Sequence, residues 1–186
     1  MAHKIAELKK RAKEARIPVI YVNDNFGRWQ SDFTKLIDHC LQDDIRGREL
    51  AELLKPDKDD YFVLKPKHSA FFSTTFDTLL AYINAKTLIL TGVAANICVL
   101  FTANDAFMRD YHLVIPADCV ASNSPEENEH ALRQMQKVLK ADITPSYRLD
   151  LQKLQRYRRQ EERPEVEQTS ESSRSAKTVD AKKAPG

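Results

Sequence analysis

Short apolar runs alternate with amphipathic segments along most of the chain. The runs are rich in Val, Ile, Leu and aromatic residues, as buried strands are, and they span residues 17–22, 61–64, 87–91 and 112–116, with an edge strand expected at 141–144. Between them, apolar residues recur at helical spacing over residues 3–16, 48–54, 76–83, 95–110 and 124–139. Strands that alternate with helices predict an α/β fold, a three-layer α/β/α architecture with a parallel, Rossmann-like sheet.

The composition changes near the end of the chain. After about Leu154 the sequence becomes polar, and residues 160–186 consist largely of Glu, Ser, Lys and Arg with almost no large apolar side chain. Such a segment buries too little apolar surface to offset the entropy lost on ordering. The sequence therefore predicts one folded domain over residues 1–150 and a polar, disordered C-terminal tail over residues 151–186.

Charge and composition exclude several classes of protein. The net charge is +2 and the basic residues are interleaved with acidic ones, which argues against a nucleic-acid partner. No apolar run approaches the roughly 20 residues that cross a bilayer, so we expect no membrane association and a cytoplasmic location. Only four glycines occur, without a Gly-x-Gly-x-x-Gly loop, which disfavours a dinucleotide cofactor. We expect a small-molecule substrate and no cofactor.

Cys98 has the most informative setting of the three cysteines. A predicted strand ends at Thr91, a turn follows, and Cys98 falls in the first turn of the next predicted helix. Unpaired N–H groups and the positive end of the helix dipole stabilise a thiolate there, and the same groups can hold an oxyanion. The alternative is a small buried core residue. Cys40 and Cys119 lack this setting, and the absence of a Cys-x-x-Cys pair argues against disulfides or zinc.

Three linked motifs resemble those of the isochorismatase-like hydrolases. Residues 92–99, Gly-Val-Ala-Ala-Asn-Ile-Cys-Val, with the following 102–106, Thr-Ala-Asn-Asp-Ala, are similar to the nucleophile motif of that family. Residues 65–74, Lys-Pro-Lys-His-Ser-Ala-Phe-Phe-Ser-Thr, resemble its lysine segment, and residues 114–122 resemble its next strand and loop. The resemblance covers about residues 3–145, in the order and spacing of the family.

The resemblance implies a catalytic triad of aspartate, lysine and cysteine. It assigns Cys98 as the nucleophile that forms a thioester and Lys65 as the lysine, with Lys67 as a less well spaced neighbour. It also implies a cis peptide between Val93 and Ala94, and an oxyanion hole made by the N–H groups of Ala94 and Cys98. Some members cleave a vinyl ether without needing the cysteine, so Cys98 favours hydrolysis of a small amide or ureido C–N bond.

The N-terminal region departs from the family pattern. The family aspartate follows a first strand that is central in the sheet, whereas this sequence begins at the next helix and has no aspartate ahead of Asp24. We therefore expect the first, central strand to be missing from this chain, through a shortened N-terminus. The alternative is a catalytically impaired binding protein, a pseudoenzyme. A redox-active thiol protein is disfavoured because Cys98 has no partner cysteine nearby.

The segment from residue 23 to residue 45 has no clean period and carries the expected substrate pocket. No histidine lies between His3 and His39, so the zinc site of nicotinamidase-like members is absent and no metal is expected. The candidate pocket residues are Asp24, Phe26, Trp29 and Phe71. A loop-capping aspartate and core-packing aromatics are the alternatives. Family members often form homo-oligomers, and we expect one here.

Overall fold

Parallel strands form the centre of the molecule in the computed structural model, which describes residues 1–25, 32–42 and 47–160. The strands are β1 Ile20–Asp24, β2 Tyr61–Lys65, β3 Thr87–Ile89, β4 Gly92–Val93, β5 His112–Val114 and β6 Val120–Ala121. The helices are α1 Ala2–Glu14, α2 Phe33–Cys40, α3 Arg48–Leu53, α4 Phe76–Tyr82, α5 Leu100–Phe107, α6 Pro125–Val138 and α7 Leu151–Gln160. A π-helical turn, Ala95–Val99, precedes α5, and 3₁₀ turns lie at Ala117–Cys119 and Ser146–Arg148.

The strands associate in parallel pairs. β1 pairs with β2, β3 with β5, and β4 with β6, every pair parallel. The register of the first pair runs from Ile20 opposite Tyr61 to Asp24 opposite Lys65. Helices connect the paired strands, as parallel pairing requires. The expected edge strand at 141–144 is reduced to a single parallel bridge between Val114 and Asp142.

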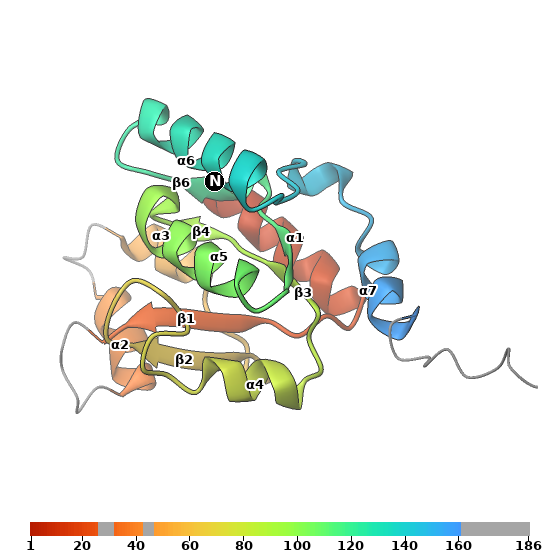
Figure 1. Ribbon diagram of the computed structural model, residues 1–186. Coiled ribbons are helices and arrows are strands. Elements are labelled where there is room, and N and C mark those ends of the chain that lie inside the picture. Colours follow the sequence, from red (N-terminus) through yellow and green to blue (C-terminus); the bar gives the residue numbers. More distant parts are fainter. Residues whose placement is uncertain (26–31, 43–46, 161–186) are drawn as a thin grey trace, which may run out of the picture.

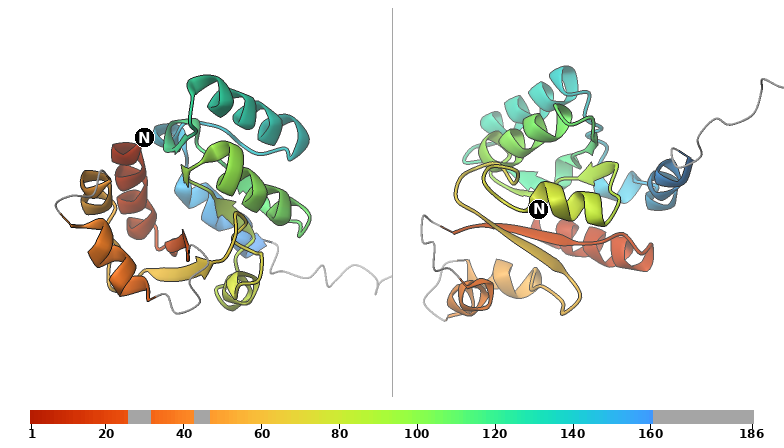
Figure 2. Two further views of the ribbon diagram at one scale, coloured as in Figure 1. Left: turned by 90° about the vertical axis from the view of Figure 1, so that its left-hand side faces the viewer. Right: turned by 60° about the horizontal axis from the view of Figure 1, so that its bottom comes forward.

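Helices cover both faces of the strands. Figure 1 shows α4, α5 and α6 in front, with α1 behind the strands, and Figure 2 shows α1 and the α5–α6 pair on opposite sides. Successive residues at β5 pack on opposite faces of the sheet. Leu113 and Ile115 belong to the apolar cluster under α5 and α6, whereas Val114 belongs to the cluster under α1. The predicted three-layer α/β/α architecture is thus confirmed. No helix within the described ranges combines the length and the apolar character that crossing a membrane requires.

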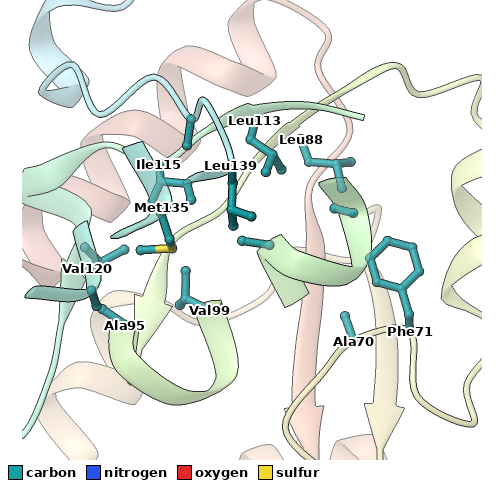
Figure 3. Close-up of a cluster of buried hydrophobic side chains, with 14 of the residues drawn as sticks. Ala70, Phe71, Leu88, Ala95, Val99, Leu113, Ile115, Val120, Met135 and Leu139 are labelled. Atoms are coloured by element: carbon teal, nitrogen blue, oxygen red, sulfur yellow. The ribbon is translucent and has the colours of Figure 1, made fainter. Parts of the chain in front are cut away.

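The larger core lies between the strands and α4, α5 and α6. Leu80, Ile115 and Met135 are completely buried in it, and Figure 3 shows Val99 beside Met135 in the same cluster. Burial of each such side chain contributes about 1.5–3 kcal/mol. Because Val99 follows Cys98 directly, this packing anchors the π-helical turn that carries the candidate nucleophile.

A cavity separates β1 from β3. Each of these strands is paired on one side only among the described residues, and both line the same cavity of about 280 Å³. Ile20 and Val22 of β1 face it from one side and Leu88 of β3 from the other. The cavity also reaches Lys65 and Cys98. It is therefore an apolar groove, bounded by two strand edges, that ends at the candidate catalytic residues.

Two segments differ from the sequence prediction. Within the stretch predicted to be irregular, residues 33–40 form α2, whose first turn is capped by the Asp32 carboxylate accepting the N–H of Thr34 at 2.8 Å. The chain also continues in regular structure past residue 150: α7 begins at Leu151, which is buried against Leu8 and Ala12 of α1. Apolar burial at that residue extends the folded part beyond the predicted boundary. Residues 161–186 lie outside the described part.

Candidate active site

The carboxyl ends of β1 and β2 bring two charged groups together. Asp24 and Lys65 are opposite each other in the register of the pair, and Lys65 Nζ lies 2.7 Å from Asp24 Oδ1. The same Nζ donates to Cys98 Sγ at 3.6 Å. The Lys65 side chain is only 4% exposed and that of Asp24 is 34% exposed, so the ammonium is buried with a carboxylate as its counter-ion. Burying an isolated charge is costly, and this pairing offsets the cost.

Cys98 lies in the π-helical turn that follows β4. The Ala94 carbonyl accepts the N–H groups of Ile97 and Val99, both at 3.1 Å, and Asn96 N donates to Ser122 Oγ at 3.2 Å. These three N–H groups are therefore engaged within the protein. The peptide bond between Val93 and Ala94 is cis. The turn places the half-buried Cys98 at the end of the cavity, with its sulfur toward Lys65.

The other candidate residues differ in where the described part of the chain places them. Phe71 is buried in the core, where its ring lies 4.9 Å from the ring of Phe76, as the core-packing alternative has it. Asp24 pairs with Lys65 at the carboxyl ends of β1 and β2. Phe26 and Trp29 lie outside the described residues. Lys67, the neighbouring lysine, is exposed.

Sequence reasoning missed two features of the site. The partnership of Asp24 with Lys65 depends on the register of β1 and β2, although both residues end predicted strands. The second feature is a set of hydroxyl contacts between α5 and the loop after Lys65. Thr102 Oγ1 accepts the N–H of Ala70 at 3.0 Å and donates to the Cys98 carbonyl at 2.7 Å. The repeated Ser and Thr residues in the motifs were the available signal.

The remaining cysteines differ from Cys98. Cys119 is completely buried, and desolvation raises the pKa of its thiol to about 11, so it stays protonated near neutral pH. Cys40 is half-buried at the end of α2. Of the cysteines, only Cys98 has a basic side chain among its hydrogen-bond partners in the described part of the chain.

The described residues contain one cluster of potential metal ligands, at a distance from Cys98 in the fold. It comprises the carboxylates of Asp57, Asp59 and Asp60. Lys13 Nζ lies within 3.0 Å of an oxygen of each, and Lys9 Nζ lies 2.7 Å from Asp60. These two ammonium groups offset much of the negative charge of the three carboxylates. The ion pairs connect α1 to the loop before β2.

The geometry agrees with the comparison to known proteins. The family model of the isochorismatase domain matches residues 1–144. The isochorismatase family protein YaaI of Bacillus subtilis is 48% identical over 140 residues, covering 75% of this chain and 76% of that protein. Enterobactin synthase component B of Escherichia coli is 33% identical over 138 residues, which are 69% of this chain but only 46% of that protein. The chain belongs to the isochorismatase family, as the motifs predicted.

Solved structures support the same class. N-carbamoylsarcosine amidase from Thermoplasma acidophilum superposes with a TM-score of 0.62 at 25% identity, over 80% of this chain and 84% of that one. A pyrazinamidase/nicotinamidase from Streptococcus mutans gives a TM-score of 0.57 at 28% identity, over 75% and 82% of the two chains. The protein is an isochorismatase-like α/β hydrolase, a class whose relatives include amidohydrolases and whose substrates are small molecules.

The surroundings of the three cysteine side chains predict which of them reacts fastest with an alkylating reagent. Iodoacetamide at neutral pH should alkylate Cys98 in preference to Cys119, because Cys98 is half-buried beside the ammonium of Lys65 whereas burial keeps Cys119 inaccessible and protonated. Lys65→Met should slow alkylation of Cys98 roughly tenfold, because it removes the cation and leaves the Asp24 carboxylate behind. Peptide mapping by mass spectrometry measures both effects.

The exposed Lys67 supplies the matched control, since Lys67→Met removes a lysine two residues away and should leave the alkylation rate of Cys98 unchanged. Labelling at Cys40 or Cys119 with Cys98 inert would contradict the assignment.

Proposed function

We propose that this protein hydrolyses a C–N bond of a small amide or ureido compound through a thioester on Cys98. One observation carries the proposal: a buried ammonium lies between a carboxylate and a thiol at the end of a cavity. A cationic side chain 3.6 Å from the sulfur is a setting typical of nucleophilic cysteines. Asp24 is the counter-ion of Lys65, at 2.7 Å from the ammonium that contacts the thiol.

The reaction proceeds in two steps. Cys98 transfers its proton to a carboxylate beside Lys65, which is supplied by the segment proposed below and is not that of Asp24. The sulfur bonds to the carbonyl carbon, and the carbonyl electron pair moves to the oxygen. The N–H groups of Ala94 and Cys98 hold that oxygen. When the carbonyl re-forms, the C–N bond breaks and the leaving nitrogen takes the proton from the carboxyl group. A water molecule then gives a proton to that carboxylate and attacks the thioester. The C–S bond breaks, the carboxyl group returns the proton to the sulfur, and the acid product leaves.

The names of relatives favour this chemistry over ether cleavage. One relative is a ureidoacrylate amidohydrolase of Methylorubrum extorquens, 34% identical over 88 residues that cover 36% of that protein. N-carbamoylsarcosine amidase and nicotinamidases occur among the structural neighbours. All three names denote the hydrolysis of an amide or ureido group. The presence of Cys98 beside Lys65 supports the same class of substrate here.

An activated ester tests the nucleophile separately from substrate choice. p-Nitrophenyl acetate should acetylate Cys98, and intact-mass and peptide mass spectrometry should locate the acetyl group there. Cys98→Ala should abolish this adduct. Asp24→Asn should lower the acetylation rate roughly tenfold, because the buried Lys65 loses its counter-ion and its charged form becomes unfavourable. Acetylation of a lysine or of Cys119 in place of Cys98 would disprove the thioester mechanism.

We further propose that an extended segment occupies the groove between β1 and β3 and supplies the carboxylate that moves the proton. Both groove walls are strand edges without a partner among the described residues. A parallel segment placed there would satisfy both edges and bury its apolar side chains. Of the three N–H donors of Lys65 Nζ, the described residues engage one with Asp24 and one with Cys98. A carboxylate at the end of the segment suits the third.

Fusing a strand ahead of Met1 tests this arrangement. The fused segment is Ala-Leu-Val-Val-Ile-Asp followed by a glycine–serine linker, with one control that ends in Asn and another with Pro at its centre. The Asp and Asn forms should raise the melting temperature and the Pro form should not, because Pro cannot donate to the ladder. The Asp form should hydrolyse ureidoacrylate, N-carbamoylsarcosine or nicotinamide at least about a hundredfold faster than the Asn form.

The outcomes of the fusion experiment separate the two candidate functions. Stabilisation by both forms without hydrolysis would favour the alternative of a non-catalytic binding protein. No stabilisation by either form would disprove the occupied groove.

We also propose a homo-oligomer built on the exposed side of β2. Among the described residues β2 pairs only with β1, and Phe62 on β2 is 55% exposed although its ring stacks on Phe33 at 4.5 Å. An unpaired strand edge with exposed aromatic side chains favours association with a second copy. Light scattering after gel filtration should give a multiple of the 21.3 kDa chain mass, and Phe62→Glu should give a monomer. A monomer before the substitution would contradict the proposal.

A further inference from the structure

One face of α5 is directed at the loop that follows Lys65. Thr102 and Asp105 are spaced at three residues and therefore lie on the same side of the helix, and Arg109 follows in the turn after α5. Arg109 Nε donates to Asp77 at 3.0 Å, and its guanidinium lies 4.5 Å above the ring of Phe71. This face joins the helix that follows Cys98 to the segment that begins at Lys65.

Two hydroxyl groups, those of Thr102 and Ser69, make hydrogen bonds between this face and the loop. Thr102 Oγ1 donates to the Cys98 carbonyl at 2.7 Å and accepts the N–H of Ala70 at 3.0 Å. Ser69 Oγ donates to Asp105 and accepts the N–H of Phe71 at 3.2 Å. Thr102, Ser69 and Ala70 are all buried, and the bonds to the N–H groups of Ala70 and Phe71 lie out of water. A hydroxyl has a single proton to donate, and each of these hydroxyls directs it to the opposite segment or to the nucleophile.

We infer that Thr102 is a positioning residue that sets the distance between Lys65 and Cys98. Its single oxygen atom joins the backbone of the nucleophile to the backbone of the lysine loop, whereas the side-chain contact between Lys65 and Cys98 spans 3.6 Å. Without the hydroxyl, the N–H of Ala70 loses its partner in a buried place, and the loop must move to satisfy it. Lys65, five residues earlier, would then move relative to the sulfur. The inference rests on the proposed role of Cys98.

Asn104 provides a matched control on the same helix. Asn104 Nδ2 donates to the Leu100 carbonyl at 2.7 Å, four residues earlier, just as Thr102 donates to the Cys98 carbonyl. Both bonds run from a side chain to the backbone carbonyl of the preceding turn. Only the hydroxyl of Thr102 also binds the lysine loop. A purely structural role of such a bond would therefore appear equally in variants of either residue.

The experiment measures the rate of iodoacetamide alkylation of Cys98 against pH in four proteins: wild type, Thr102→Val, Thr102→Ser and Asn104→Ala. Peptide mapping restricts the measurement to Cys98, and urea unfolding gives the stability of each protein. Thr102→Val should alkylate roughly fivefold more slowly at neutral pH, with its profile moved to higher pH, as the loss of one hydrogen bond predicts. Thr102→Ser should restore the wild-type profile to within about twofold, because it keeps the hydroxyl.

The Asn104→Ala control distinguishes a positioning role of Thr102 from a general loss of stability. Asn104→Ala should lower stability and leave the alkylation profile unchanged. An equal shift in Asn104→Ala, or a wild-type profile in Thr102→Val, overturns the inference while leaving Cys98 as the nucleophile. An inert Cys98 in the wild type overturns the nucleophile and this inference together. If Thr102→Val does not fold, Ser69→Ala replaces it, because it removes the other hydroxyl between the segments and should shift the profile in the same direction.

Discussion

The buried ammonium of Lys65 is the group on which the rest of the site depends. Its side chain is 4% exposed, and a charge so far from water persists only with close partners. Asp24 and Cys98 are those partners among the described residues. The sulfur of Cys98 lies 3.6 Å from this ammonium, in a region where water screens charge less than at the surface. One placement of a lysine thus imposes the position of the carboxylate and the character of the thiol.

The fold creates this placement through strand register and helix geometry. β1 and β2 end together, so their last residues, Asp24 and Lys65, are brought side by side by the ladder of hydrogen bonds. The thiol arrives from a separate part of the chain, through the π-helical turn after β4. π-helical turns often occur at functional sites, where they change the direction in which a side chain points. The sheet and the turn together bring three distant residues into contact, two of which, Lys65 and Cys98, line the cavity.

Much of the architecture could be predicted from the sequence, whereas the contacts within the site could not. Apolar runs located the strands that contain Val22, Leu64 and Leu88, because burial on both faces requires continuous apolar sequence. The motifs indicated Cys98 and Lys65. The contact of Asp24 with Lys65 depends on register, which no periodicity within one strand reveals. Helix α2 was missed because apolar residues around it do not recur at a clear helical spacing. Leu151 is buried, so regular structure continues past residue 150, where the sequence predicted a tail.

The cavity between β1 and β3 links the stability of this protein to its contents. Any molecule that enters it in the native state, and has no affinity for the unfolded chain, adds a free energy that grows with the logarithm of its concentration. A molecule at about 100 times its dissociation constant contributes roughly 2.7 kcal/mol, a large share of the 5–15 kcal/mol typical of a domain. The fraction of folded protein thus depends on the concentration of any molecule that binds between the two strand edges. Occupancy of this one groove therefore couples the free energy of unfolding to the region that reaches Lys65 and Cys98.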